Sequence, residues 1–211
     1  MSGVVVIDSG VANIGSVVAA LTRIGAATVV SRDWEVIRHG ERVLLPGVGS
    51  AAAAMRELKA LGLCDRLPSL KQPVLGVCLG MQLLFESSDE GSTLAQPASV
   101  TCLKILPGQV RALTPGPGVR IPHMGWNALI PLRFHPLVKG LSRSDFAYFV
   151  HSYGVDIGAS TLMACEHGRT FSAIVGARNF FGAQFHPERS ADVGARLLGN
   201  FIETPMEQLC A

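Results

Sequence analysis

Residues 73–85 have the sequence PVLGVCLGMQLLF, in which Gly76-Val-Cys-Leu-Gly80 joins an apolar run to a helical pattern. This is the G-x-nucleophile-x-G spacing of a tight turn between a strand and a helix. Side chains at Gly76 and Gly80 would crowd the neighbouring backbone of such a turn. The segment therefore predicts a strand, a strained turn that lifts the sulfur of Cys78 above a sheet, and a helix that begins at this cysteine.

Apolar runs alternate with helical patterns on the N-terminal side of this turn. They predict strands at residues 4–7, 27–30, 42–45 and 73–77, the third of them stopped by Pro46 and Gly47. Helices are predicted after Asn13, a candidate cap, and at residues 50–60 and 81–85. Strands that are apolar throughout and separated by helices are typical of a parallel sheet covered on both faces. We therefore expect an α/β fold with a mostly parallel open sheet flanked by helices.

The rest of the chain predicts an antiparallel extension. Residues 87–122 are rich in Gly, Pro, Ser and Thr, which favours loops and short antiparallel strands at the sheet's edge. Later strands are predicted at residues 146–150, 162–165, 172–176 and 181–185, and a final helix at residues 191–202. A length of 211 residues suits one domain, so we expect a single domain over residues 1–211.

Composition excludes several functional classes. With 18 basic and 16 acidic residues and no basic block, the chain is not expected to bind nucleic acid. The sequence contains no run of about 18 apolar residues, so a membrane span is not expected. The opening MSGVVVIDSG does not resemble a signal peptide. No ligand cluster suggests a metal or another cofactor. Scattered cysteines predict reduced thiols in a cytoplasmic protein; besides Cys78 they are Cys64, Cys102, Cys165 and Cys210.

Cys78 is a candidate nucleophile because the thiolate is the reactive form of cysteine. A free cysteine has a pKa of about 8.5, which helix N-termini and neighbouring imidazolium groups lower. The backbone N–H of Leu79 is a candidate donor to an oxyanion at the same turn. The alternative is a small buried cysteine, but the two glycines and the strand–helix context favour a nucleophile.

The segment Pro46-Gly-Val-Gly49 ends a predicted strand at the same edge of the sheet. Glycines permit close backbone approach and unusual peptide orientations. We interpret the segment as a second oxyanion donor and part of a cradle for a substrate amide, although an ordinary turn has the same composition. The residues concerned are Gly47, Val48 and Gly49.

A base for Cys78 is predicted at His186. Of the six histidines, only this one directly follows an apolar strand and directly precedes a proline and an acid, in Phe185-His-Pro-Glu188. Glu188 could bind one ring nitrogen while the other faces the cysteine, which orients the imidazole and stabilises its charged form. The motif alone would also suit a surface turn; with the cysteine turn it predicts a Cys-His-Glu triad.

PGVG, GVCLGMQ and FHPE together resemble the class I glutamine amidotransferase domain over roughly residues 3–203. The resemblance implies a flavodoxin-like fold and a Cys-His-Glu amidase that releases ammonia from glutamine. Within that family, the stretches DSGVAN, PHMGWN, YFVHSY and HPERS resemble the glutaminase subunit of imidazole glycerol phosphate synthase. This implies a heterodimeric lyase complex of histidine biosynthesis, in which ammonia is channelled to a cyclase subunit.

The resemblance also implies roles for single residues. Gln82 and the backbone around His151 and Ser152 match positions that contact the substrate. The positions that it places toward the cyclase are Asn13, His123, Trp126 and Arg189. The chain departs from the family's pattern at Ser9, where Tyr is usual, at Ala12, where Gly is usual, and at Arg189, where Lys is common; these changes bear on coupling to the partner rather than on the triad.

Three alternatives remain open from the sequence. The chain could serve another ammonia-using synthase, such as that for pyridoxal phosphate or anthranilate. It could be a protein with the cysteine turn but no amidase activity, such as a redox sensor or chaperone. It could also hydrolyse γ-glutamyl peptides.

Overall fold

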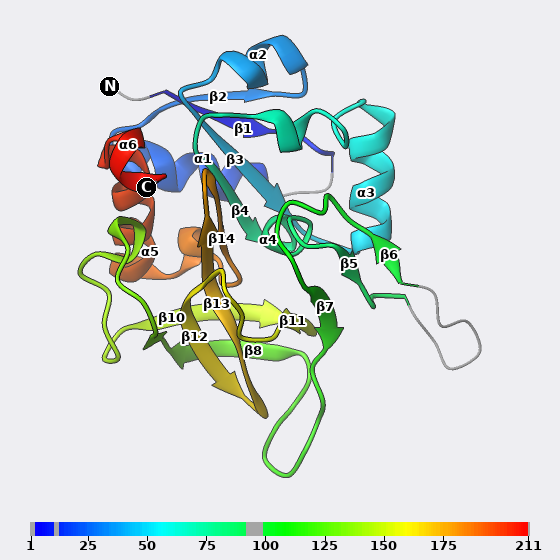
Figure 1. Ribbon diagram of the computed structural model, residues 1–211. Helices are drawn as coiled ribbons and strands as arrows, with labels where there is room; N and C mark the ends of the chain where they lie inside the picture. The colour runs from blue at the N-terminus through cyan, green and yellow to red at the C-terminus, as the bar shows by residue number, and fades with distance from the viewer. Residues whose placement is uncertain (1–2, 11–12, 92–98, 211) are drawn as a thin grey trace.

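The computed structural model describes residues 3–10, 13–91 and 99–210, and its centre is an eight-stranded sheet (Figure 1). The strand order is β2-β1-β3-β4-β14-β13-β12-β9. Its first five strands run parallel and are β1 (Gly3–Ile7), β2 (Ala27–Ser31), β3 (Arg42–Gly47), β4 (Val74–Cys78) and β14 (Phe180–Ala183). The antiparallel extension consists of β13 (Arg169–Ala177), β12 (Thr161–His167) and β9 (Ile130–Pro131).

Helices cover both faces of the parallel part, as the sequence predicts. Alternate residues of β1 enter different cores: Val4 and Val6 lie in the core with α1 (Ile14–Arg23) and α5 (Ala191–Glu203). Val5 and Ile7 lie in the core with α2 (Trp34–His39) and α3 (Ala51–Ala60). The short helices are α4 (Leu79–Gln82), α6 (Met206–Leu209), η1 (Leu67–Ser69), η2 (Pro136–Val138) and η3 (Pro187–Arg189).

Two smaller sheets lie beside the extension (Figure 1). One pairs β8 (His123–Ala128) with β10 (Phe146–His151) in antiparallel register. The other has the order β11-β7-β5-β6, formed by β11 (Tyr153–Val155), β7 (Gln109–Ala112), β5 (Ser87–Ser88) and β6 (Val100–Thr101). Residues 87–122 do form short strands, but the prediction that these lie at the edge of the central sheet is wrong, because they pair with each other and with β11. Residues 92–98 of that segment lie outside the described residues.

Three local predictions also differ from the structure. Helix α1 starts directly after Asn13, but the side chain of Asn13 makes no capping hydrogen bond. Strand β3 continues through Pro46 and Gly47, because the proline forfeits only its own N–H and both residues still align with β4. Helix α4 ends at Gln82, and the carbonyls of residues 83–85 instead accept hydrogen bonds from the backbone of residues 103–106.

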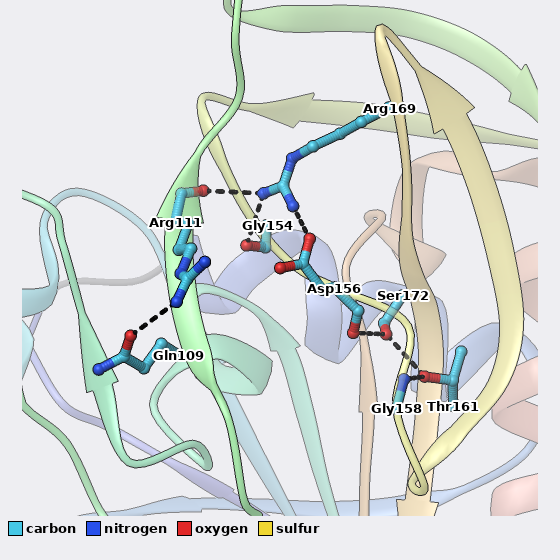
Figure 2. Close-up of polar contacts among 8 residues, drawn as sticks. All are labelled: Gln109, Arg111, Gly154, Asp156, Gly158, Thr161, Arg169 and Ser172. Atoms are coloured by element: carbon cyan, nitrogen blue, oxygen red, sulfur yellow. Dashed lines mark hydrogen bonds and ion pairs between the residues drawn. The ribbon is translucent and has the colours of Figure 1, made fainter.

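Arg169, at the start of β13, connects the β11-β7-β5-β6 sheet to the central sheet (Figure 2). Its guanidinium donates to the carbonyl oxygens of Gly154 at 3.2 Å and Arg111 at 3.3 Å, and it forms an ion pair with Asp156. The hydroxyl of Ser172 donates to the Asp156 carbonyl at 3.0 Å. These contacts hold β11, whose first residue borders the candidate site described next.

Candidate active site at the ends of β3, β4 and β14

Three parallel strands end side by side at one edge of the sheet. Gly47 at the end of β3 aligns with Cys78 at the end of β4. Strand β14 aligns with β4 on its other side, and the chain reaches His186 three residues after β14 ends. Segments that are 108 residues apart in the sequence, 186 minus 78, are thereby brought to one edge.

The backbone at Cys78 is strained as predicted for a nucleophile on a tight turn. Its φ of +52° is one that side-chain-bearing residues rarely adopt. A Cβ at Gly76 would lie 2.5 Å from the Gly80 oxygen, and a Cβ at Gly80 would lie 1.9 Å from the Leu45 oxygen. Glycine is therefore required on both sides of the cysteine. As the first residue of α4, Leu79 has a backbone N–H without a partner inside its helix.

A cavity of about 360 Å³ opens at this turn. It is lined by Cys78 and His186 and by six of the seven residues predicted for oxyanion or substrate binding; Gly47 is the exception. Those six are Val48, Gly49, Leu79, Gln82, His151 and Ser152. Residues for which the sequence predicted no individual role complete the lining: Glu90, and from the PHMGWN and YFVHSY stretches Pro122, Met124, Val150 and Tyr153. Gly47 lies behind, in a narrow space shared with Asn13, His186 and Glu188.

His186 and Glu188 form a buried pair. The ring Nδ1 lies 2.8 Å from Glu188 Oε1, and both side chains are shielded from solvent. Burial alone would lower the pKa of His186, but the nearby Cys78 sulfur together with the hydrogen bond and charge of Glu188 outweighs it and raises the pKa to about 10. Among the described residues, ring Nε2 has no partner that meets hydrogen-bond geometry. The arrangement provides a charged, oriented imidazole with its second nitrogen available at the cavity.

Ser190 holds the His186 turn against β10, a role that sequence reasoning missed. Its fully buried hydroxyl donates to the His186 carbonyl at 2.7 Å and accepts from the Tyr148 N–H at 2.9 Å. The Tyr148 carbonyl in turn accepts from the His186 N–H at 3.0 Å. Only its place in HPERS marked Ser190 in the sequence.

Gln184 is a second residue that the sequence did not reveal. It is fully buried, and its Nε2 lies 3.9 Å from the Cys78 sulfur. Its Oε1 accepts from Gln82 Nε2 at 3.0 Å, and the same Gln82 nitrogen donates to the Tyr153 carbonyl at 2.9 Å. A glutamine inside an apolar strand run was the only available signal.

The four residues that the resemblance places toward a partner do not share one environment. Asn13, Trp126 and Arg189 are exposed. His123 is only 3% exposed, and its ring points inward to His151, so its side chain does not lie on the surface with the other three. Ser9 is buried, and Ala12 lies outside the described residues.

Within residues 3–10, 13–91 and 99–210, no three His, Cys, Asp or Glu side chains gather as a metal site would require. The helices in those ranges are all too short or too polar to cross a lipid bilayer.

Comparison with known proteins identifies relatives over nearly the whole chain. The sequence profile of the family described as Glutamine amidotransferase class-I matches residues 5–204. Imidazole glycerol phosphate synthase subunit HisH of Xanthomonas campestris pv. campestris (strain 8004) is 51% identical over 203 residues, which are 96% of this chain and 98% of the relative. The protein of the same name from Xylella fastidiosa (strain 9a5c) has the same identity and coverage.

A solved structure shares the fold at much lower sequence identity. The structure of PurLQS from Thermotoga maritima superposes with a TM-score of 0.67 at 18% identity, covering 95% of this chain and 97% of the other. These findings confirm the resemblance and the α/β fold predicted from the sequence.

Proposed function

The chain belongs to the class-I glutamine amidotransferase family and, within it, to the HisH subunits, and we propose that it is the glutaminase subunit of an imidazole glycerol phosphate synthase. It hydrolyses glutamine to glutamate and ammonia, and the ammonia passes to a cyclase subunit. The observation that carries this proposal is the cavity in which the strained Cys78 turn meets the His186–Glu188 pair. The 51% identity to HisH proteins supports this synthase over the other ammonia-using synthases.

In the first half of the reaction, the Cys78 thiolate attacks the side-chain amide carbon of glutamine. The carbonyl oxygen becomes an oxyanion, which the N–H of Leu79 and a peptide of the 46–49 segment hold. His186, charged at neutral pH, gives a proton to the departing nitrogen as the carbon–nitrogen bond breaks. Ammonia leaves, and a γ-glutamyl thioester remains on Cys78.

In the second half, the neutral His186 takes a proton from water, which attacks the thioester carbon. The carbon–sulfur bond breaks, glutamate leaves, and the thiolate and imidazolium are restored. Glu188 stays hydrogen-bonded to Nδ1 throughout, so Nε2 is the nitrogen that exchanges protons.

The cavity lining fits an amino-acid substrate. Glu90 contributes a carboxylate that accepts from the backbone N–H of Ala51, and burial raises the pKa of that carboxyl group. An α-ammonium group of glutamine would give this half-buried carboxylate an ionic partner. Gln82 and the backbone at His151 and Ser152 provide further polar groups around the remaining substrate atoms.

An exposed apolar face supports docking of a cyclase. The outward side chains of β8 and β10 include Met124, Trp126 and Phe146, each more than half exposed, and Trp126 packs edge-on to Tyr148. Apolar side chains gathered on one sheet face are typical of protein interfaces. Because Tyr148 shares hydrogen bonds with His186 and Ser190, this face lies close behind the triad.

The test is a reaction of the purified chain with the cyclase subunit of imidazole glycerol phosphate synthase. The Cys78→Ala variant should abolish glutamine-dependent synthesis and glutamate release while ammonia-dependent synthesis by the complex continues. A γ-glutamyl adduct on Cys78, detected by mass spectrometry after treatment with a glutamine-like electrophile, identifies the nucleophile. Glutamate release that persists in Cys78→Ala contradicts the proposal.

A further inference from the structure

A line of hydrogen bonds leads from the exposed strand β8 inward to the cavity. Asn127 Nδ2 lies 3.3 Å from His123 Nε2, and His123 Nδ1 lies 3.0 Å from His151 Nε2. His151 Nδ1 lies 2.7 Å from the Tyr153 carbonyl oxygen. His123 and His151 face each other because they are direct partners in the β8–β10 register. Neither ring takes part in the mechanism above.

The chemistry of the two ends fixes the direction of every bond in this line. At one end, the Tyr153 carbonyl oxygen only accepts, so His151 Nδ1 carries a proton. At the other end, the Asn127 amide nitrogen only donates, because Asn127 Oδ1 accepts from the Ala128 N–H, so His123 Nε2 is an acceptor. The proton of His123 therefore lies on Nδ1 and is donated to His151 Nε2. Both rings are therefore neutral, and both carry their proton on Nδ1.

The surroundings of the pair keep it uncharged. The His123 ring stacks on His167 at 4.0 Å between centroids and on Phe149 at 4.9 Å, which excludes water. Burial lowers the pKa of His123 to about 3 and that of His151 to about 4. A proton added to His151 would place two N–H groups against each other, so the pair remains neutral across the pH range in which most enzymes act.

The line ends on Gln82, which borders the nucleophile. The Tyr153 carbonyl accepts from both His151 Nδ1 and Gln82 Nε2, one bond for each oxygen lone pair. The second proton of Gln82 Nε2 goes to Gln184 Oε1. With both amide protons used, the group that Gln82 offers to the cavity is its oxygen.

We propose that His123 and His151 are positioning residues that hold the Gln82 amide with its oxygen toward the cavity and so set the affinity for glutamine. This inference rests on the proposed glutaminase function. The amide nitrogen and the ammonium group of glutamine are donors, so an oxygen from Gln82 attracts them and an NH₂ group repels them. Loss of the donor at His123 leaves His151 Nε2 buried without a partner, which frees the Tyr153 carbonyl to shift and the Gln82 amide to turn over.

The test measures steady-state kinetics with L-glutamine for the full chain bound to the cyclase. His123→Phe keeps a flat ring that stacks on His167 but donates no hydrogen bond. Its KM for glutamine should rise about tenfold, the effect of one unsatisfied buried hydrogen-bonding group, while kcat per alkylatable Cys78 changes by less than about twofold. His123→Asn, which carries an amide N–H near the Nδ1 position, should restore most of the affinity.

His135→Phe is the matched control. His135 is a partly buried histidine that contacts Phe181 outside the line, and the same substitution there should leave KM unchanged. A general folding defect would instead lower the active fraction at unchanged KM. An unchanged KM in His123→Phe, an equal rise in His135→Phe, or no recovery in His123→Asn overturns the proposal.

A second measurement needs neither activity nor a variant. Nitrogen-15 spectra of the wild-type imidazole rings at neutral pH should show His123 and His151 neutral and protonated on Nδ1. A charged ring or an Nε2–H form at either position overturns the proposal. If the wild-type complex releases no glutamate from glutamine, the proposed glutaminase function is wrong. The spectra would still test the proposed protonation states of His123 and His151 independently of that result.

Discussion

Replacing Glu188 with glutamine is expected to lower the pKa of His186 substantially. In the wild type, Cys78 and Glu188 outweigh the effect of burial and raise the pKa from 6.5 to about 10. Glutamine keeps the shape of the side chain and an oxygen for Nδ1 but removes the charge. A hydrogen bond to a charged group contributes about 1.5–3 kcal/mol, and one pH unit corresponds to about 1.4 kcal/mol. The pKa of His186 should therefore fall by about one to two pH units.

The same change alters how stability depends on pH. The pKa of His186 is higher in the folded than in the unfolded chain, so its protonation stabilises the fold fully below pH 6.5. This contribution disappears as the pH rises through about 10 in the wild type and at lower pH in Glu188→Gln. The variant should be less stable than the wild type by about 1.5–3 kcal/mol near neutral pH. This difference in stability should shrink as the pH approaches the pKa of His186 in the wild type.

Two assays check this expectation. A carbon-13 titration of the His186 ring, assigned by its absence in His186→Phe, reports the pKa directly. Urea denaturation at several pH values reports the free energy of unfolding. Glu203→Gln, an exposed carboxylate change at the end of α5, is the control and should leave both unchanged. A His186 pKa near 6.5 in the wild type, or equal values in wild type and Glu188→Gln, would refute the reasoning.

Three further changes test the framework of the site. Gly80→Ala should lower the melting temperature sharply and abolish activity, because the added carbon would lie 1.9 Å from the Leu45 oxygen. Gly199→Ala, which has open space around it on α5, is the control and should stabilise the fold by about 0.5–1 kcal/mol. Equal melting temperatures for the two variants would contradict this expectation. Arg42→Met should cost about 2–4 kcal/mol in urea denaturation, since two bonds of 2.6 Å to carbonyls at the end of α5 are lost, with unchanged activity per folded molecule; unchanged unfolding would refute it. Ser190→Ala should reduce kcat about tenfold by loosening the turn that holds His186, the proposed base. A wild-type kcat would show that the hydroxyl is dispensable.

Local chemistry made much of the fold readable from the sequence. The predicted strands β3, β4 and β14 are buried at every residue, so their apolar runs are continuous. Glycines mark the Cys78 turn because any side chain there would meet backbone. Strand β8 was missed because it alternates one buried histidine with exposed and half-exposed residues. Helix α2 was missed because only Ile37 of its six residues is buried.

The sequence by itself determined the groups that act over short distances: the cysteine between its glycines, and a histidine two residues from its carboxylate. Only the tertiary structure decided which strands are neighbours, and therefore that β14 delivers Gln184 and His186 to the end of β4. It also decided that His123 turns inward to His151 rather than outward. Side-chain direction along a strand depends on register with a partner far away in the chain, and no short motif encodes that register.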